Sequence, residues 1–204
     1  AGLDQNWRAR AAERARLEPG MKALDLCCGT GDLAMMLAER VGPEGEVIGA
    51  DFSRPMLDLA LDKAKNEGLK QAQFKWADAL DLPFEDESFD AVTIAFGARN
   101  LADLEKGISE MRRVLVPGGR LVILEITQPR RQPLAGFFGL WFDRIVPQLG
   151  KLAGDSSAYT YLPESVRSFP DAETLAGKLD AGGFSHVRWT LMAGGIIALH
   201  SGVR

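Results

Sequence analysis

Apolar runs and stretches of helical spacing alternate along most of the chain. The apolar runs fall at residues 21–27, 46–51, 72–78, 89–96 and 120–127. Runs of this length, read as continuous rather than as alternating polar and apolar positions, predict strands that are buried on both faces. Between the last two runs, leucine, isoleucine and methionine recur on one face of a helix at 101–115. This alternation predicts a doubly wound α/β fold with a mostly parallel sheet.

Residues that begin or end helices mark the boundaries of these segments. The chain has helical composition from Arg8 to Leu17, and the sequence "EPG" ends that helix. Asp32 is placed to cap a helix that runs through Arg40, and Ser53 is placed to cap the next one. The sequence "PGG" is expected to close the helix at 101–115 before the fifth strand begins.

The C-terminal part of the chain departs from this alternation. A helix is predicted at Pro170–Gly183, and two apolar stretches follow with only Gly194-Gly195 between them. Two strands joined in this way predict an antiparallel β-hairpin. The expected fold is therefore a doubly wound, mostly parallel seven-stranded sheet that ends in an antiparallel β-hairpin. That arrangement differs from the usual dinucleotide dehydrogenase domain and matches the Rossmann-like fold of S-adenosylmethionine (SAM)-dependent methyltransferases.

Length and composition narrow the class further. A chain of 204 residues with 46% hydrophobic and 25% charged residues suits a single globular domain over 1–204. The formal net charge is −4 and the basic residues are scattered, which argues against a nucleic-acid partner. The two cysteines, Cys27 and Cys28, are adjacent and predict neither a disulfide framework nor a zinc site. We therefore expect a cytoplasmic protein without a metal centre.

The stretch "LDLCCGTGDLA", from Leu24 to Ala34, reads as a buried strand, a glycine loop and the start of a helix. Gly29 and Gly31 lack a Cβ atom, so a ligand can lie against the loop, with the amides of Gly29, Thr30 and Gly31 facing it. The same residues also satisfy the loose dinucleotide pattern G-x-G-x-x-A. The loop alone therefore leaves both NAD and SAM open as ligands.

The ends of the next two strands carry further ligand-binding candidates. Asp51 follows the second strand, 20 residues beyond Gly31, where a carboxylate can accept hydrogen bonds from both ribose hydroxyls. Phe52 comes next in the chain and is expected in the same site. Asp78 and Ala79 follow the third strand, where a carboxylate and an amide can pair with an adenine ring. Ligands bind at the carboxyl ends of strands in open α/β sheets, so these residues predict one nucleotide-type site.

Asp25 lies inside the first strand, where a carboxylate is costly to bury without partners. In a SAM site it can hold backbone amides of the glycine loop or the ammonium group of the ligand.

Several segments together resemble one family, the ubiquinone/menaquinone biosynthesis C-methyltransferases. They are "LDLCCGTGDLA", the run from Asp78 to Ile126, "YTYLPESVRSFP" and "AGGIIALHSG". The resemblance implies the SAM methyltransferase fold and SAM-dependent methylation of a ring carbon of a membrane-dissolved polyprenyl quinol. Thr30, Asp51, Asp78 and Ala79 match cofactor positions of the family, and Ala95 falls where some relatives carry a serine contact. The family's tyrosine-aspartate pair ahead of "WR" has no counterpart, because no tyrosine precedes Tyr159.

The sequence "FGARN" follows the fourth strand, where methyltransferases place their acceptor. A ring carbon becomes nucleophilic when a neighbouring hydroxyl loses its proton, so the quinol and not the quinone is the expected substrate. Arg99 can stabilise the developing phenolate, and Asn100 can orient a water or the ring oxygen. The alternative for Arg99 is a surface ion pair with Asp103 on the same helical face. His200 is expected to be a buried, hydrogen-bonded structural residue.

An aromatic helical insert is predicted at about 130–168. Its apolar side chains share one face, which suits core packing, a lid over a prenyl tail, or contact with a membrane surface. The expected partners are the quinol, the inner face of a membrane and a second copy of the chain. Two other functions stay open: a SAM methyltransferase for another lipid-like acceptor, and an NAD-dependent oxidoreductase that only the glycine pattern favours.

Overall fold

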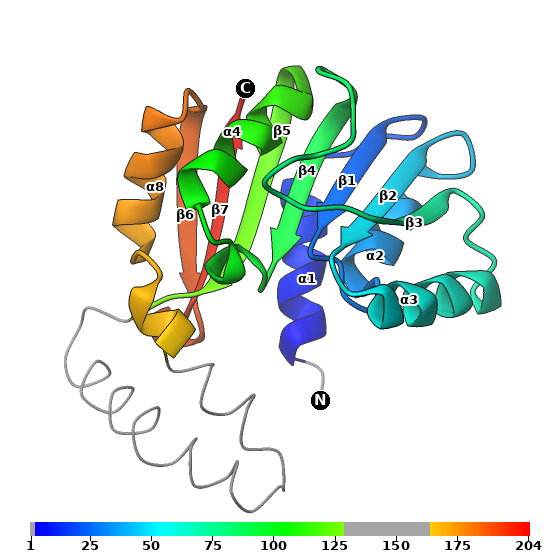
Figure 1. Cartoon of the computed structure of the whole chain (residues 1–204), viewed down its shortest axis with the longest axis horizontal. Helices are drawn as coiled ribbons and strands as arrows, with labels where there is room; N and C mark the ends of the chain where they lie inside the picture. Colours follow the sequence, from blue (N-terminus) through cyan, green and yellow to red (C-terminus); the bar gives the residue numbers. More distant parts are fainter. Residues whose placement is uncertain (1–2, 129–163) are drawn as a thin grey trace, which may run out of the picture.

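A computed structural model describes residues 3–128 and 164–204 of the chain, and these residues form a seven-stranded sheet with helices on both faces (Figure 1). The strands are β1 (Lys22–Leu26), β2 (Glu46–Asp51), β3 (Ala72–Trp76), β4 (Phe89–Ala95), β5 (Leu115–Ile126), β6 (Ser185–Met192) and β7 (Ile197–Val203). Their order in the sheet is β3-β2-β1-β4-β5-β7-β6. The first five strands are parallel, and β7 pairs antiparallel with both β5 and β6. The predicted sheet and its terminal hairpin are confirmed.

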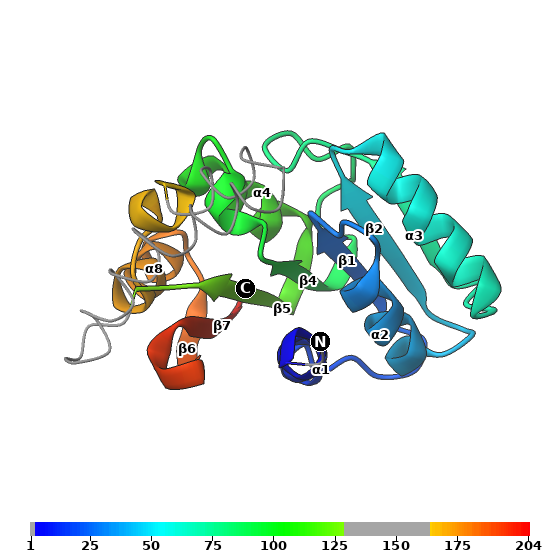
Figure 2. The same cartoon turned by 90° about the horizontal axis from the view of Figure 1, so that it is seen from below.

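Helices that pack on the sheet complete the layers of the described residues. They are α1 (Leu3–Arg14), α2 (Asp32–Val41), α3 (Arg54–Asn66), α4 (Leu104–Val114) and α8 (Ala172–Ala181). Figure 2 shows α1 on one face of the sheet and α4 with α8 on the other. Helix α2 packs beside α1, and α3 packs along β2 and β3. Single turns of 3₁₀ helix at Ala98–Asn100 and Ala193–Gly195 follow β4 and β6.

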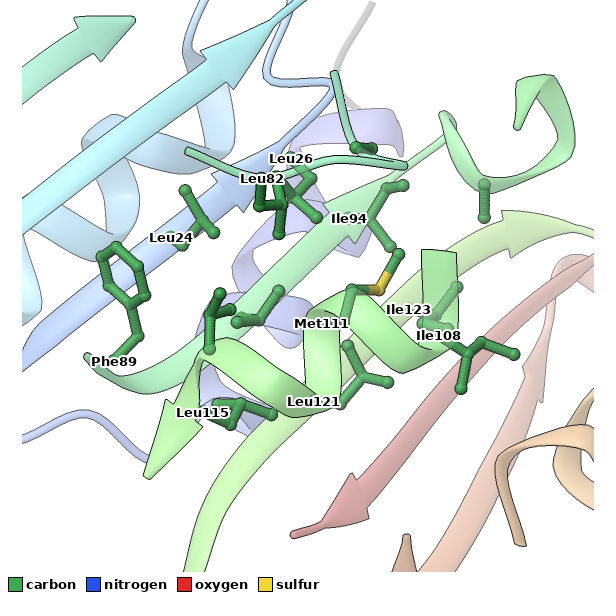
Figure 3. Packing of buried hydrophobic residues seen from close by; sticks show 14 of the residues in the cluster. Leu24, Leu26, Leu82, Phe89, Ile94, Ile108, Met111, Leu115, Leu121 and Ile123 are labelled. Carbon is green, nitrogen blue, oxygen red and sulfur yellow. The ribbon is translucent and has the colours of Figure 1, made fainter. Parts of the chain in front are cut away.

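The larger of the two hydrophobic clusters lies between the sheet and α4 (Figure 3). Leu24 of β1, Ile94 of β4 and Met111 of α4 belong to this cluster, and the Met111 side chain points towards Ile94. All three are at most 1% exposed. Burial of a large apolar side chain contributes about 2 kcal/mol, so this face holds β1 and β4 in register at the point where both strands end.

Two helix boundaries differ from the sequence-based prediction. Helix α1 begins at Leu3 and ends at Arg14, so the helical segment lies further towards the N-terminus than Arg8–Leu17. Helix α4 ends at Val114, and β5 begins at the next residue, so "PGG" lies within the strand rather than before it. Gly118 has a φ of +82°, which lets the strand change direction where its register against β4 shifts.

The caps of α2 and α3 were predicted wrongly in part. Gly31 is the N-cap of α2, and Asp32 is its first residue, where it forms an ion pair with Lys63 of α3 instead of a cap. Ser53 occupies the N-cap of α3, but its side chain makes no capping hydrogen bond. The cap of α4 is Asp103, whose side chain accepts a hydrogen bond of 2.9 Å from the amide of Lys106.

The aromatic insert predicted at about 130–168 lies almost wholly outside the described residues. Helical backbone is present again at 164–168, just ahead of α8. In the described part of the chain, no helix is long and apolar enough to cross a membrane.

Candidate functional site

A cavity of about 580 Å³ opens at the carboxyl ends of the central strands. Its lining includes Asp51 and Phe52 after β2, Asp78 and Ala79 after β3, and Asn100 after β4. Because neighbouring parallel strands end at the same edge of the sheet, residues far apart in the sequence meet here. The structure therefore brings together five of the eleven residues that the sequence analysis assigns to the site.

The glycine loop contacts this cavity through Asp51. The amide of Gly29 donates a hydrogen bond of 2.8 Å to Oδ2 of Asp51, and the amide of Ser53 donates one of 2.8 Å to Oδ1. Both carboxylate oxygens are thus held in place and each keeps a lone pair for a further donor. This geometry suits a carboxylate that receives two vicinal hydroxyls.

Gly29, Thr30 and Gly31 do not themselves line the cavity. The φ angles of Gly29 and Gly31 are +53° and +80°, a conformation that other residues rarely adopt. A Cβ at Gly31 would lie 2.8 Å from the ring of Phe74 in β3, so this glycine also allows the loop to pack closely on the sheet. The Thr30 hydroxyl lies 3.4 Å from Oδ2 of Asp32.

Phe52 and Trp76 form an aromatic pair at the cavity. Their ring centroids lie 5.4 Å apart, and the indole N–H of Trp76 donates a hydrogen bond of 2.9 Å to the carbonyl oxygen of Phe52. Phe52 is 71% exposed although its ring is large and apolar. An exposed aromatic ring beside a cavity offers a flat surface against which a planar ligand can stack.

Asp25 lies beneath the cavity rather than in its lining. Its side chain is 1% exposed and accepts a hydrogen bond of 2.6 Å from the hydroxyl of Thr93 in β4. Burial raises the pKa of Asp25 from 3.8 to about 7, although the Thr93 hydrogen bond and the charge of Arg8 oppose the shift. This carboxyl therefore changes its protonation state near neutral pH, next to the strand end that contributes Leu26 to the cavity.

Arg99 is held in a buried ion pair that the sequence analysis did not foresee. Its Nη1 donates hydrogen bonds of 2.6 Å to Oε1 of Glu125 and 2.6 Å to the carbonyl oxygen of Phe96. The amide of Arg99 and that of Ile126 also donate to the Glu125 carboxylate. The partner is therefore Glu125 of β5, and the predicted alternative, a surface pair with Asp103, is wrong.

The guanidinium of Arg99 retains unused donors. Its side chain is 12% exposed, and Nε is buried without a hydrogen-bond partner among the described residues. The Glu125 side chain is 1% exposed, and burial raises the pKa of its carboxyl even though the charge of Arg99 opposes the shift. Arg99 does not line the cavity, whereas the adjacent Asn100 does. The ion pair thus holds the Arg99 side chain in place, one residue before the cavity-lining Asn100.

Ala95 ends β4 but is not part of the cavity lining. It packs instead against the hydrophobic cluster beneath α1 and α2. The next residues, Phe96 and Gly97, line the cavity in its place. Phe96 has a φ of +59°, so the backbone turns sharply at the strand end and brings the following residues under the cavity.

His200 is a buried structural residue, as the sequence analysis expects, and the two cysteines are half-buried. Burial raises the pKa of Cys27 to about 12 and also raises that of Cys28, so both thiols stay protonated and unreactive at neutral pH. His200 is buried, and its Nε2 lies 2.7 Å from the carbonyl oxygen of Ala172. Burial lowers the pKa of His200, and the neutral ring stacks on Trp189, away from the cavity.

The sequence analysis missed Thr93 and Glu125, the buried partners of Asp25 and Arg99. Both are polar residues inside apolar strands, and that was the only available signal. Across residues 3–128 and 164–204 there is no group of three or more histidine, cysteine, aspartate or glutamate side chains arranged to hold a metal ion.

Comparison with known proteins agrees with this geometry. The model of the ubiE/COQ5 methyltransferase family matches residues 2–204. A protein of Thermus thermophilus named "Demethylmenaquinone methyltransferase" is 50% identical over 204 residues, which span all of this chain and 91% of that protein. A protein of Idiomarina loihiensis named "Ubiquinone/menaquinone biosynthesis C-methyltransferase UbiE" is 41% identical over all of this chain and 82% of its own length.

Among solved structures, a SAM-dependent methyltransferase from Aquifex aeolicus superposes with a TM-score of 0.69 at 20% identity. The superposition covers 96% of this chain and 88% of that protein. This likeness concerns the fold, whereas the sequence relatives identify the family. The NAD alternative rested on the loose glycine pattern alone and has no support from these relatives. The chain belongs to the ubiE/COQ5 methyltransferase family and has the fold of SAM-dependent methyltransferases.

Proposed function

We propose that this chain transfers the methyl group of SAM to a ring carbon of a polyprenyl quinol, and that its acceptor is demethylmenaquinol. Membership of the family makes the chain a SAM-dependent C-methyltransferase of quinone biosynthesis. The choice of a naphthoquinol over a benzoquinol is supported by the name of the Thermus relative, which is 50% identical. The site geometry supports the chemistry as follows.

The cavity residues fit an adenosyl group. Asp51 is positioned by two backbone amides and can accept hydrogen bonds from the ribose hydroxyls. The amide of Leu80 donates a 2.9 Å hydrogen bond to Oδ1 of Asp78, which orients that carboxylate towards an exocyclic amino group. The exposed ring of Phe52 can stack on the adenine. When bound, SAM supplies an electrophilic methyl group on a sulfonium, so the protein's task is to position the acceptor and exclude water.

Arg99 is proposed to act on the acceptor. A phenolate must form before the ring carbon can attack, and a nearby guanidinium lowers the energy of that negative charge. Glu125 and the Phe96 carbonyl hold Nη1, and no hydrogen bond to a described residue uses Nη2, which leaves it available for the ring oxygen. Arginine does not accept a proton itself, so it stabilises the phenolate while a water oriented by Asn100 carries the proton away. The Arg99–Glu125 pair beside Asn100 is the observation that carries this proposal.

The test combines the redox state of the acceptor with one variant. Wild-type protein should methylate demethylmenaquinol and leave the oxidised quinone unchanged, because the quinone has no hydroxyl to ionise. Arg99→Lys keeps a positive charge against Glu125 but loses the planar fork, and should lower turnover roughly 100-fold, the scale of a lost oxyanion contact. SAM affinity and melting temperature should stay near those of Arg40→Lys, a change on the exposed end of α2.

Three results would contradict the proposal. Turnover of the oxidised quinone without reductant would exclude the phenolate step. A loss of turnover in Arg99→Lys that only follows a loss of SAM affinity, or of folded protein, would make Arg99 structural. Faster turnover of a demethylated benzoquinol than of demethylmenaquinol would move the acceptor to the other ring class.

A further inference from the structure

Five arginines from three elements converge beside the edge of the sheet opposite β3. Arg10 and Arg14 lie on α1, Arg16 just after it, Arg120 on β5 and Arg188 on β6. They line two adjoining hollows of about 410 and 590 Å³ that share Arg14 and Arg16. Figure 2 shows α1 beneath the centre of the sheet, with β7 and β6 to its side. We call this feature the arginine groove.

The charge of the groove is not balanced by neighbouring carboxylates. The chain as a whole carries a net charge of −4. Even so, none of the five arginines forms an ion pair with any residue of the described ranges. Glu13 is the one acidic residue among those that line the two hollows. A cluster of cations without counter-charges destabilises itself, so its presence in an acidic protein needs an explanation.

The side chains of the groove are positioned by neutral groups. Arg14 donates hydrogen bonds of 3.4 Å to the hydroxyl of Ser201 and 3.2 Å to that of Thr190. These contacts orient the guanidinium across β6 and β7 but leave its charge uncompensated. Burial lowers the pKa of Arg120, and the charges of Arg16, Arg14 and Arg188 lower it further. Arg16, Arg14 and Arg188 therefore all lie close enough to Arg120 to repel its charge.

We infer that the arginine groove is a binding site for phosphate groups, which nothing in the methyl-transfer site requires. A guanidinium presents parallel N–H donors that match two oxygens of a phosphate, and phosphate removes the repulsion between arginines by supplying the missing negative charge. Two adjoining hollows favour a ligand with more than one phosphate, or several singly charged headgroups.

Two sources could supply such phosphates: acidic phospholipid headgroups and soluble polyphosphate compounds. The lipid source has one additional feature in its favour. Trp189 lines the larger hollow together with Arg188, and Trp189 and Leu191 of β6 are 43% and 52% exposed. Tryptophan beside arginine is characteristic of surfaces at the level of lipid headgroups.

The experiment uses two probes and a double variant that removes two positive charges from the groove. Arg16→Gln/Arg188→Gln alters two exposed side chains of the groove, and Arg40→Gln/Lys65→Gln is the matched control with the same loss of charge on α2 and α3. Pyrophosphate binding is followed by calorimetry. Vesicle binding is followed by co-sedimentation with phosphatidylglycerol-containing vesicles against pure phosphatidylcholine ones. Melting temperatures verify that both variants are folded.

Wild-type protein and the control should bind at least one probe, and the groove variant should bind that probe at least about tenfold more weakly. Binding of the anionic vesicles without binding of pyrophosphate assigns the groove to lipid headgroups, and binding of pyrophosphate assigns it to soluble phosphates. The inference fails if wild-type protein binds neither probe, or if the groove variant binds as the control does. Neither failure affects the proposed methyl transfer, which is measured separately on the acceptor.

Discussion

Replacing Asp25 by asparagine should make the unfolding free energy of the protein less dependent on pH and should weaken SAM binding. Asp25 is buried beside Thr93, and burial raises its pKa from 3.8 to about 7. A carboxyl whose pKa is higher in the folded state stabilises the fold below the unfolded pKa. That stability is lost as the pH rises through the folded pKa. Asparagine has the same shape, can still accept the hydrogen bond from Thr93, and does not titrate.

The size of the effect follows from the two pKa values. A shift from 3.8 to about 7 corresponds to about 4 kcal/mol between the fully protonated and the fully ionised carboxyl. Between pH 5 and pH 8 the wild type should lose about 2–3 kcal/mol of unfolding free energy through the ionisation of Asp25. The Asp25→Asn variant should show no such loss at this position. His200 and Glu125 also have shifted pKa values, but they are common to both proteins and cancel in the difference.

Urea unfolding of the wild type and Asp25→Asn at pH 5 and pH 8 measures this difference directly. Asp62→Asn, an exposed substitution on α3, is the control and should track the wild type at both pH values. If Asp25 also holds the ammonium group of SAM, the variant should bind SAM at least about tenfold more weakly, the scale of a hydrogen bond between charged groups. If the difference in unfolding free energy between the wild type and Asp25→Asn stays constant from pH 5 to pH 8, the assignment of a raised pKa to Asp25 is refuted.

Two further substitutions test the rest of the site. Glu125→Gln removes the charge that faces Arg99 in a buried pair, so unfolding free energy should fall by about 3 kcal/mol in urea titrations, and turnover should fall further than SAM affinity. An unchanged midpoint would show that the pair contributes no net stability. Asp51→Ala should weaken SAM binding by about 2–3 kcal/mol in calorimetry, since it removes the acceptor for the ribose and releases the Gly29 amide. Unchanged affinity would remove Asp51 from the site.

The central strands were predictable because a strand that is buried on both faces appears in the sequence as a continuous apolar run. The run at 46–51 coincides with β2, and the runs at 21–27 and 89–96 contain β1 and β4 with at most two additional residues at either end. The edge strand β3 also appears as an apolar run, yet Gln73, Lys75 and Trp76 are exposed in it. A pattern of hydrophobic residues thus locates strands better than it distinguishes a central strand from an edge strand.

Helix ends were harder to predict because several short-range contacts compete for the same polar side chain. Asp32 has the residue type of a cap, but Gly31 already provides the left-handed turn that starts α2. The Asp32 carboxylate then has a stronger partner in Lys63, which lies 31 residues away and reaches it only because α3 packs nearby. An ion pair formed by tertiary packing therefore overrides a local capping preference, and no sequence window contains both residues.

The same reasoning explains why strand-end residues were identified more readily than their partners. Parallel topology brings the carboxyl ends of neighbouring strands together, so Asp51, Asp78 and Asn100 could be assigned to one site from their positions alone. Which residue turns towards the ligand depends on the local backbone. At the end of β4, Ala95 packs on the core while Phe96 lines the cavity.

The partner of Arg99 depends on the register of β4 against β5, which places Ala95 opposite Leu124 and so brings Glu125 beside the loop after β4. Local spacing favoured Asp103, four residues further along the chain, but a carboxylate buried in the adjacent strand binds the same guanidinium with less competition from water. A polar residue within an otherwise apolar strand is consequently the sequence feature to examine first when a strand-end arginine needs a partner.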